Sequence, residues 1–181
     1  MEKRDALVSN GTYYIGVDPG TVNLGFAAIE DNKEHPLVSK GMIDPSKLTI
    51  KATVELLFNS LPGGNLVFVV ERYVAYNGKL SEATERILMI IGAIVFEAQR
   101  RGHEVLMFRA IDWKPEIAKY LFKNHSFKNP STALDKKFSV AAAKALTGVS
   151  DLTTHTADAI CLAFKGKLSN ELVQQTAPQN G

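Results

Sequence analysis

The sequence is poor in cysteine and has no apolar run of membrane-spanning length. The single cysteine, Cys161, excludes an internal disulfide framework and a zinc site built on several thiolates. The longest apolar run, Ile87 to Phe96, reaches only about half of the ~20 residues that a bilayer requires. The first residues, MEKRDALVSNGT, lack the apolar core of a secretory signal. These absences favour a reducing, intracellular setting without membrane contact.

Net charge is also small, because 21 Lys and Arg stand against 19 Asp and Glu in 181 residues. The charges are unevenly distributed, however. The stretch from Arg100 to Lys144 holds ten basic residues and four acids, a net +6, and the rest of the chain therefore carries −4. Such asymmetry suggests a polyanionic partner, although a solvated face rich in lysine explains it equally well.

The hydrophobic pattern predicts an α/β fold with a mixed five-stranded sheet flanked by helices. Strands are predicted at residues 13–17, 23–30, 37–43, 66–70 and 103–108. Helices are predicted after residue 45 and at 81–101, 112–123, 134–147 and 154–168. The order predicts three antiparallel strands followed by two parallel ones. We expect a single domain over residues 13–168, with flexible ends at 1–12 and 169–181.

Four side chains with catalytic potential lie at the ends of predicted elements. Asp18 ends the first strand at an Asp-Pro-Gly turn, and Glu71 ends the most apolar strand. His155 and Asp158, three residues apart, share one face near the start of the last helix. Sheets with parallel strands place their sites at carboxyl strand ends, so these groups are expected to meet there. Such oxygen-rich clusters suit Mg²⁺ or Mn²⁺, and two ions about 4 Å apart can promote phosphodiester hydrolysis.

Each of these residues also has a purely structural explanation. Asp18 can serve as a turn former, and Glu71 can be paired by Arg72 or Arg86. Asp158 fits the positive end of a helix dipole, although a cationic His155 does not. The order of the residues along the chain and their placement at element ends, more than any one residue, favour a functional site.

Three segments occur in a familiar order: Tyr14–Thr21 (YIGVDPGT) followed by Gly25, then Val67–Glu71 (VFVVE), then His155–Ala163 (HTADAICLA). Together they resemble the motifs of RuvC-type Holliday-junction resolvases, which belong to the RNase H-like, retroviral integrase superfamily. The resemblance spans about residues 13–167 and extends to phage-encoded relatives.

The resemblance implies an RNase H-like fold and a homodimer that nicks four-way DNA junctions symmetrically. It implies two Mg²⁺ or Mn²⁺ ions per active site, no nucleotide cofactor, and products with 5′-phosphate and 3′-hydroxyl ends. Asp18, Glu71, His155 and Asp158 would be both catalytic residues and metal ligands. His155 departs from the aspartate of many members, which could favour Mn²⁺ or let the imidazole contact the scissile phosphate. Asp151, one turn earlier, is the second choice for this acid.

Basic and aromatic residues near the predicted site are candidates for DNA contacts. Tyr73 or Tyr76 can stack on an unpaired base, worth about 1–3 kcal/mol, or can simply pack beneath the loop after Glu71. The resemblance places a DNA-wedging aromatic in this loop and basic DNA contacts near Arg109 and Lys114. The predicted nucleic-acid contacts are Arg72, Tyr73, Tyr76, Asn77, Lys79, Arg109 and Lys114.

The helix predicted at 81–101 indicates an oligomer. Its middle, Ile87–Phe96, is apolar all round, so both of its sides need cover. The sheet can cover one side and a twin helix from a second subunit the other, with Gly92 and Ala93 allowing close approach. Burial beneath another helix of the same chain is the alternative. The predicted dimer interface consists of Ile87, Ile91, Ile94 and Val95.

The sequence is also compatible with other functions. Within the nuclease class the alternative is an RNA-processing or branched-DNA nuclease of the same fold. A non-catalytic nucleic-acid-binding module is the second alternative, which Mn²⁺ titration and a cleavage assay would separate from a nuclease. The turn at residues 18–21 also resembles the phosphate loop of sugar kinases and actin-like ATPases. Those proteins need two such domains around the nucleotide, whereas these 181 residues hold one. Trp113 is interpreted as a packing residue.

Overall fold

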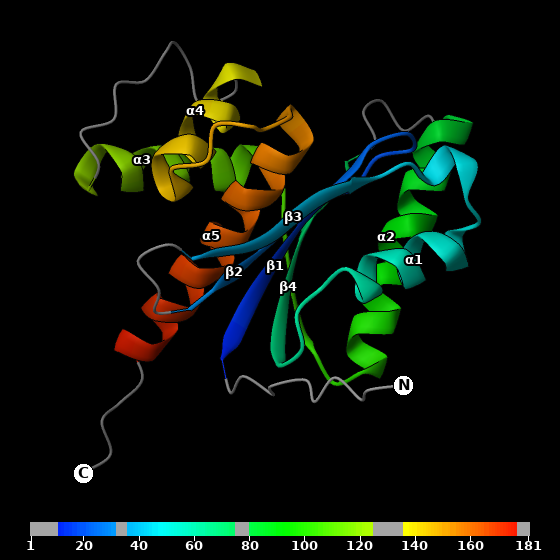
Figure 1. Cartoon of the computed structure of the whole chain (residues 1–181), viewed down its shortest axis with the longest axis horizontal. Coiled ribbons are helices and arrows are strands. Elements are labelled where there is room, and N and C mark those ends of the chain that lie inside the picture. The colour runs from blue at the N-terminus through cyan, green and yellow to red at the C-terminus, as the bar shows by residue number, and fades with distance from the viewer. Residues whose placement is uncertain (1–10, 32–35, 75–79, 125–135, 177–181) are drawn as a thin grey trace, which may run out of the picture.

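A five-stranded sheet forms the centre of the molecule (Figure 1). The computed structural model describes residues 11–31, 36–74, 80–124 and 136–176. The strands are β1 (Thr12–Asp18), β2 (Leu24–Glu30), β3 (Leu37–Ile43), β4 (Asn65–Glu71) and β5 (Glu104–Phe108). They lie in the order β3-β2-β1-β4-β5. β2 is antiparallel to β1 and β3, whereas β4 is parallel to β1 and to β5, which confirms the predicted mixed sheet.

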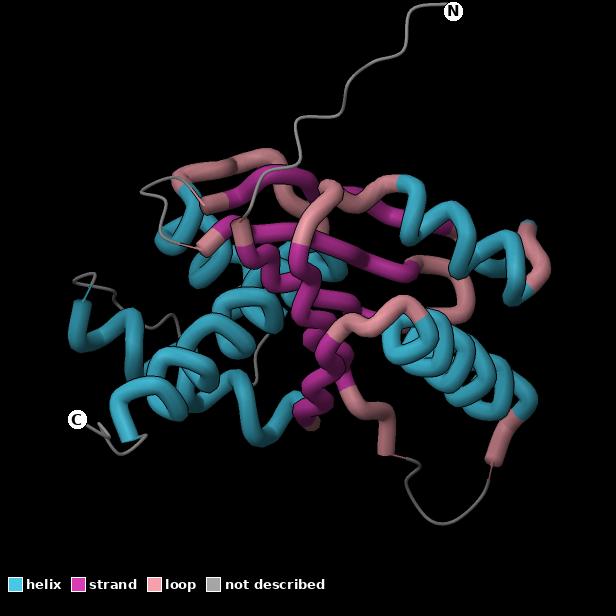
Figure 2. Tube along the Cα trace, turned by 90° about the horizontal axis from the view of Figure 1, so that it is seen from below, coloured by secondary structure: helices cyan, strands magenta, loops and turns pink. Residues whose placement is uncertain are grey.

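Helices cover both faces of the sheet. They are the 3₁₀ helix η1 (Pro45–Lys47) and the α-helices α1 (Ile50–Asn59), α2 (Glu82–Arg100), α3 (Ala110–Asn124), α4 (Lys136–Thr147) and α5 (Thr154–Thr176). α1 and α2 lie on one face and α3, α4 and α5 on the other, as Figure 2 also shows. α5 continues beyond its expected end at residue 168. Within the described ranges, no helix has the length and apolar character needed to cross a bilayer.

The central strands separate two apolar cores. Successive side chains of a strand point to opposite faces, so Ile15 and Val17 of β1 pack with α1 and α2 while Tyr14 packs with α5. Residues 66–70 of β4 are buried throughout. Because β4 has helices over both faces, its sequence is an unbroken apolar run rather than an alternating one.

Helix α1 begins at Ile50, after the short helix η1, and not directly after residue 45. Thr49 is its N-cap and accepts a hydrogen bond from the backbone N–H of Ala52. Leu48 therefore precedes the helix. Within α1, Leu57 is buried and Leu56 is exposed.

Helix α2 places part of its apolar middle against its own sheet. Ile91 and Ile94 belong to the core of the same chain, which corrects the prediction that they form a dimer interface. Ile87 and Val95 are partly buried against the same core. An all-round apolar sequence does not reveal which side faces the sheet, so it could not show that Ile91 and Ile94 are the buried positions. The exposed large apolar residues of α2 are Leu88, Met89 and Phe96.

Helix α5 lies directly on the backbone of β1 and β2 at two glycines. A Cβ at Gly16 would lie 1.8 Å from the carbonyl oxygen of Ala159, and one at Gly25 would lie 2.3 Å from that of His155. Asp18 pairs with Gly25 in the β1–β2 register. The close approach at Gly25 therefore brings the start of α5 beside the end of β1.

Candidate active site

The structure brings the four predicted site residues to one edge of the sheet. Asp18 ends β1 and Glu71 ends β4, immediately after a parallel pair formed by Val17 and Val70. Both carboxyl groups therefore lie at the carboxyl edge of neighbouring parallel strands, as expected. The first turns of α5 add His155 and Asp158.

Each of the three carboxylates has its own hydrogen-bond partner. Nδ1 of His155 lies 2.7 Å from Oδ2 of Asp18. Nε1 of Trp113 donates to Oε2 of Glu71 at 3.0 Å, and the hydroxyl of Ser139 donates to Oδ1 of Asp158. The sequence interpretation missed Trp113 and Ser139 as partners.

Burial and mutual repulsion dominate the electrostatics of the site. Burial, followed by the charges of Asp18 and Asp158, raises the pKa of Glu71 to about 7 against the opposing effects of Trp113 and Lys114. Burial also raises the pKa of Asp18, the hydrogen bond from His155 lowers it, and Asp158 raises it. Three partly buried carboxylates that repel one another are typical of a functional site, whereas acids in structural ion pairs lie beside opposite charges.

Lys114 lies among these acids and not on the open surface. Its Nζ is 3.6 Å from Oδ1 of Asp158, and its side chain is only 12% exposed. Its charge also lowers the pKa of both Asp18 and Glu71. Lys114 was predicted as a DNA contact, and the structure makes it the counter-ion of the acidic cluster.

The carboxylate oxygens and the imidazole of the site are suitable ligands for a divalent cation. Carboxylate oxygens are the preferred ligands of Mg²⁺ and Mn²⁺, and a histidine bonded through Nδ1 can coordinate only through Nε2. The repulsion that raises the pKa of Asp18 and Glu71 is what such an ion relieves. Across the described part of the chain, no three His, Cys, Asp or Glu side chains already converge on one point. Some side-chain rearrangement would therefore be needed for these residues to ligate one ion together.

A hollow of about 340 Å³ adjoins Glu71 and holds three of the predicted DNA contacts. Its lining includes Arg72, Tyr73 and Arg109, with Val74, Ala110 and Ile111 beside them. Tyr73 is 39% exposed. Arg109 is held by two hydrogen bonds to Asp112, of 2.8 and 2.9 Å. The predicted contacts Tyr76, Asn77 and Lys79 lie outside the described residues.

Asp151, the second choice for the fourth ligand, lies in the segment before α5. Its side chain is exposed, and its backbone carbonyl accepts a hydrogen bond of 2.7 Å from Nζ of Lys40. It is not among the charges that shift the pKa of Asp18 or Glu71. His155, by contrast, contacts Asp18 directly.

Glu71 should cost the protein stability at neutral pH. Its pKa is about 7 in the folded chain against an ordinary 4.5, so the folded state binds the proton more tightly than the unfolded state. The resulting penalty is absent below about pH 4.5, grows as pH rises, and is complete above about pH 7, at about 3 kcal/mol. We expect Glu71→Gln to raise the free energy of unfolding, measured with urea, by about 2–3 kcal/mol more at pH 8 than at pH 5. An equal effect of Glu71→Gln at both pH values would contradict the raised pKa of Glu71.

Comparison with known proteins finds similar structures but no similar sequences. No protein-family model matches the chain, and no curated protein sequence matches it significantly. The structure of Thermus thermophilus RuvC matches with a TM-score of 0.64 and 18% identity, over 89% of this chain and 96% of that one. T. thermophilus RuvC in complex with a Holliday junction substrate matches with a TM-score of 0.63 and 17% identity, over 88% and 96%. At this identity the likeness establishes the fold, and it confirms the predicted RuvC-like, RNase H-like architecture.

Proposed function

We propose that this protein is a structure-selective DNA endonuclease that resolves four-way (Holliday) junctions by symmetric nicking. One observation carries the proposal: three carboxylates in mutual electrostatic contact lie at the carboxyl edge of a RuvC-like sheet. The comparison adds support, because a protein of the same fold has been captured with a Holliday junction substrate. The net +6 of the stretch from Arg100 to Lys144 is in keeping with a DNA partner.

We assign Asp18, Glu71, Asp158 and His155 to hold two Mg²⁺ or Mn²⁺ ions per active site. Such ions polarise a phosphodiester, lower the pKa of water and stabilise the leaving oxygen. The carboxylates supply hard, anionic oxygen donors for them. The Nδ1 contact with Asp18 fixes the ring plane of His155, so that its other nitrogen has a defined direction toward an ion or the scissile phosphate.

Other residues would bind and orient the DNA around this centre. Lys114 places a positive charge within the cluster, where negative charge develops on the phosphate during attack. The hollow beside Glu71 offers Tyr73 as a stacking surface for an unpaired base and Arg72 and Arg109 for phosphates. In-line attack by water would leave a 5′-phosphate and a 3′-hydroxyl. Tyr76, Asn77 and Lys79 are also proposed to contact DNA.

Cleavage of a matched set of DNA substrates tests the proposal. Four-way junction, flap and linear duplex should be compared with Mg²⁺ and with Mn²⁺. The expected result is a pair of symmetric nicks in the four-way junction and no cutting of linear DNA. Equal cutting of the flap would indicate a general branched-DNA nuclease. Junction binding without cutting under either ion would contradict the enzyme assignment and leave a binding module.

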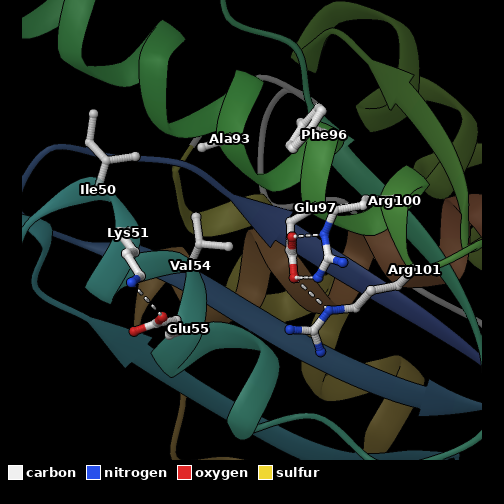
Figure 3. Close-up of a pocket in the computed structure, with 9 residues that line it drawn as sticks. All are labelled: Ile50, Lys51, Val54, Glu55, Ala93, Phe96, Glu97, Arg100 and Arg101. Atoms are coloured by element: carbon white, nitrogen blue, oxygen red, sulfur yellow. Dashed lines mark hydrogen bonds and ion pairs between the residues drawn. The ribbon is translucent and has the colours of Figure 1, made fainter.

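We further propose that the active form is a homodimer formed through α2. Its exposed residues Leu88, Met89 and Phe96 need cover. Phe96 also lines a hollow of about 460 Å³ between α1 and α2, where Figure 3 shows Glu97 hydrogen-bonded to Arg100 and Arg101. A two-fold dimer would present two equivalent active sites to the two strands of one junction.

The dimer proposal predicts that charge on this face separates the subunits. The double variant Met89→Asp with Phe96→Asp should be a monomer by light scattering at micromolar concentration, because an interface would have to bury both carboxylates. Val38→Asp is the matched control, since Val38 is comparably exposed but lies on β3. A monomeric wild-type protein, or a double variant that remains dimeric, would contradict the proposed interface.

A further inference from the structure

The only tryptophan of the chain contacts the acidic cluster from within the core. Trp113 is fully buried and packs in the cluster that also holds Ile117, Phe138 and Ile160. Its Nε1 donates a hydrogen bond of 3.0 Å to Oε2 of Glu71. Because close packing fixes the whole indole ring, it also fixes the position of the nitrogen.

Glu71 depends on such a fixed partner for its orientation. A glutamate side chain has three rotatable bonds and loses considerable conformational entropy when it is held in one arrangement. The hydrogen bond to Trp113 holds one carboxylate oxygen, Oε2, at a set place relative to the end of β4. The indole N–H is a neutral donor that does not compete with a cation for charge.

The first turn of α3 reaches two different carboxylates. Trp113 contacts Glu71 from β4, and the next residue, Lys114, lies 3.6 Å from Asp158 of α5. Nζ of Lys114 also lies 5.1 Å from the centre of the Trp113 ring. The edge of the indole thus contacts Glu71. Its face contacts Lys114, which is the counter-ion of Asp158.

We propose that Trp113 is a positioning residue that aims the Glu71 carboxylate at the divalent cation of the active site. The inference rests on the proposed nuclease function and adds a specific determinant to it. We place Trp113 in contact with neither DNA nor the reacting atoms, so that it acts through the Glu71 carboxylate that it holds.

Trp113→Phe separates the hydrogen bond from the packing. Phenylalanine keeps an aromatic face for Lys114 but has no N–H. We expect turnover with Mg²⁺ to fall about 10- to 100-fold, the loss of one hydrogen bond to a charged group. Junction affinity should stay within about twofold of wild type, because Trp113 is buried away from the DNA surface. Mn²⁺ affinity measured by calorimetry should fall together with turnover.

Ile117→Val is the matched control, because Ile117 lies one turn further along α3 in the same core cluster and is fully buried. It loosens the core without removing a donor, so its turnover and Mn²⁺ affinity should equal those of wild type. Trp113→Phe behaving as wild type, or Ile117→Val losing as much as Trp113→Phe, would overturn the proposal.

Fluorescence of the single tryptophan gives a readout that needs neither DNA nor a folded Trp113 variant. Titration of wild type with Mg²⁺ alone should change the Trp113 emission, and Glu71→Gln should lose that response. No change in emission at Mg²⁺ concentrations that bind by calorimetry, or no binding at all, would overturn the proposal. A protein that cuts no DNA but keeps this Glu71-dependent response would refute the nuclease function and leave the positioning role standing.

Discussion

Glu71→Gln should lower junction cleavage in single-turnover assays by at least about 10³-fold, while junction binding should stay within a few-fold of wild type. Glutamine keeps the shape of the side chain and an oxygen that can accept from Trp113. It removes the charge, and with it one anionic ligand for a divalent cation. The change should also stabilise the protein at pH 8, since the buried carboxylate is costly there.

Glu55→Gln is the appropriate control for this result. Glu55 is an exposed acid on α1 that pairs with Lys51 at 3.7 Å, and it lies outside the cluster. Its loss should leave cleavage unchanged. Substantial activity in Glu71→Gln, or a loss of junction binding equal to the loss of cleavage, would count against Glu71 as a metal ligand.

Gly16→Ala should destabilise the protein by about 3 kcal/mol or more, because an added methyl group cannot be accommodated under α5. Its Cβ would lie 1.8 Å from the carbonyl oxygen of Ala159, and neither backbone can yield without moving the helix. Since α5 carries His155 and Asp158, the surviving folded fraction should also cut poorly. Urea unfolding and single-turnover cleavage measure the two effects.

Gly63→Ala provides the comparison, because a Cβ at Gly63 would meet nothing within 4 Å. Its unfolding free energy should lie within about 0.5 kcal/mol of wild type. Wild-type stability in Gly16→Ala would mean that α5 does not lie on β1 as the structure has it, and the placement of His155 and Asp158 would fall with it.

The acidic cluster opposes the folding of the chain. Repulsion and burial raise the pKa of Glu71 to about 7, and only neighbours such as Trp113 and Lys114 offset them. An acid kept for stability alone would have a lowered pKa, as Glu97 has beside Arg100 and Arg101 on α2. The contrast between Glu71 and Glu97 supports a functional reason for the cluster.

The strands and their order could be predicted because their signals are local. The unbroken apolar run of β4 and the Asp-Pro-Gly turn after β1 mark where Glu71 and Asp18 lie, and the three-residue spacing of His155 and Asp158 fixes a shared helix face. Parallel pairing of β1 with β4 then brings the strand ends together. The places of these four candidate residues in the fold could therefore be predicted from the sequence.

The partners of these acids depend on tertiary packing, which no local pattern encodes. Trp113 and Ser139 reach Glu71 and Asp158 only through the way α3 and α4 pack on the sheet. An apolar tryptophan and a helical serine give no sign of a polar contact in the sequence.

The burial of Ile91 and Ile94 on α2 could not be predicted for a related reason. The helix is apolar on several sides, so its sequence could not show that Ile91 and Ile94 face the sheet while Met89 and Phe96 face outward. In both cases the missing information was the rotation of a helix about its own axis.

Anomalous scattering from a crystal of this protein soaked in Mn²⁺ tests the central claim most directly. We predict Mn²⁺ at the carboxyl edge of the sheet, contacted by oxygens of Asp18, Glu71 and Asp158, with Lys114 moved away from Asp158. Mn²⁺ bound only at exposed acids such as Glu55, with Lys114 still beside Asp158, would contradict the proposed metal-dependent nuclease.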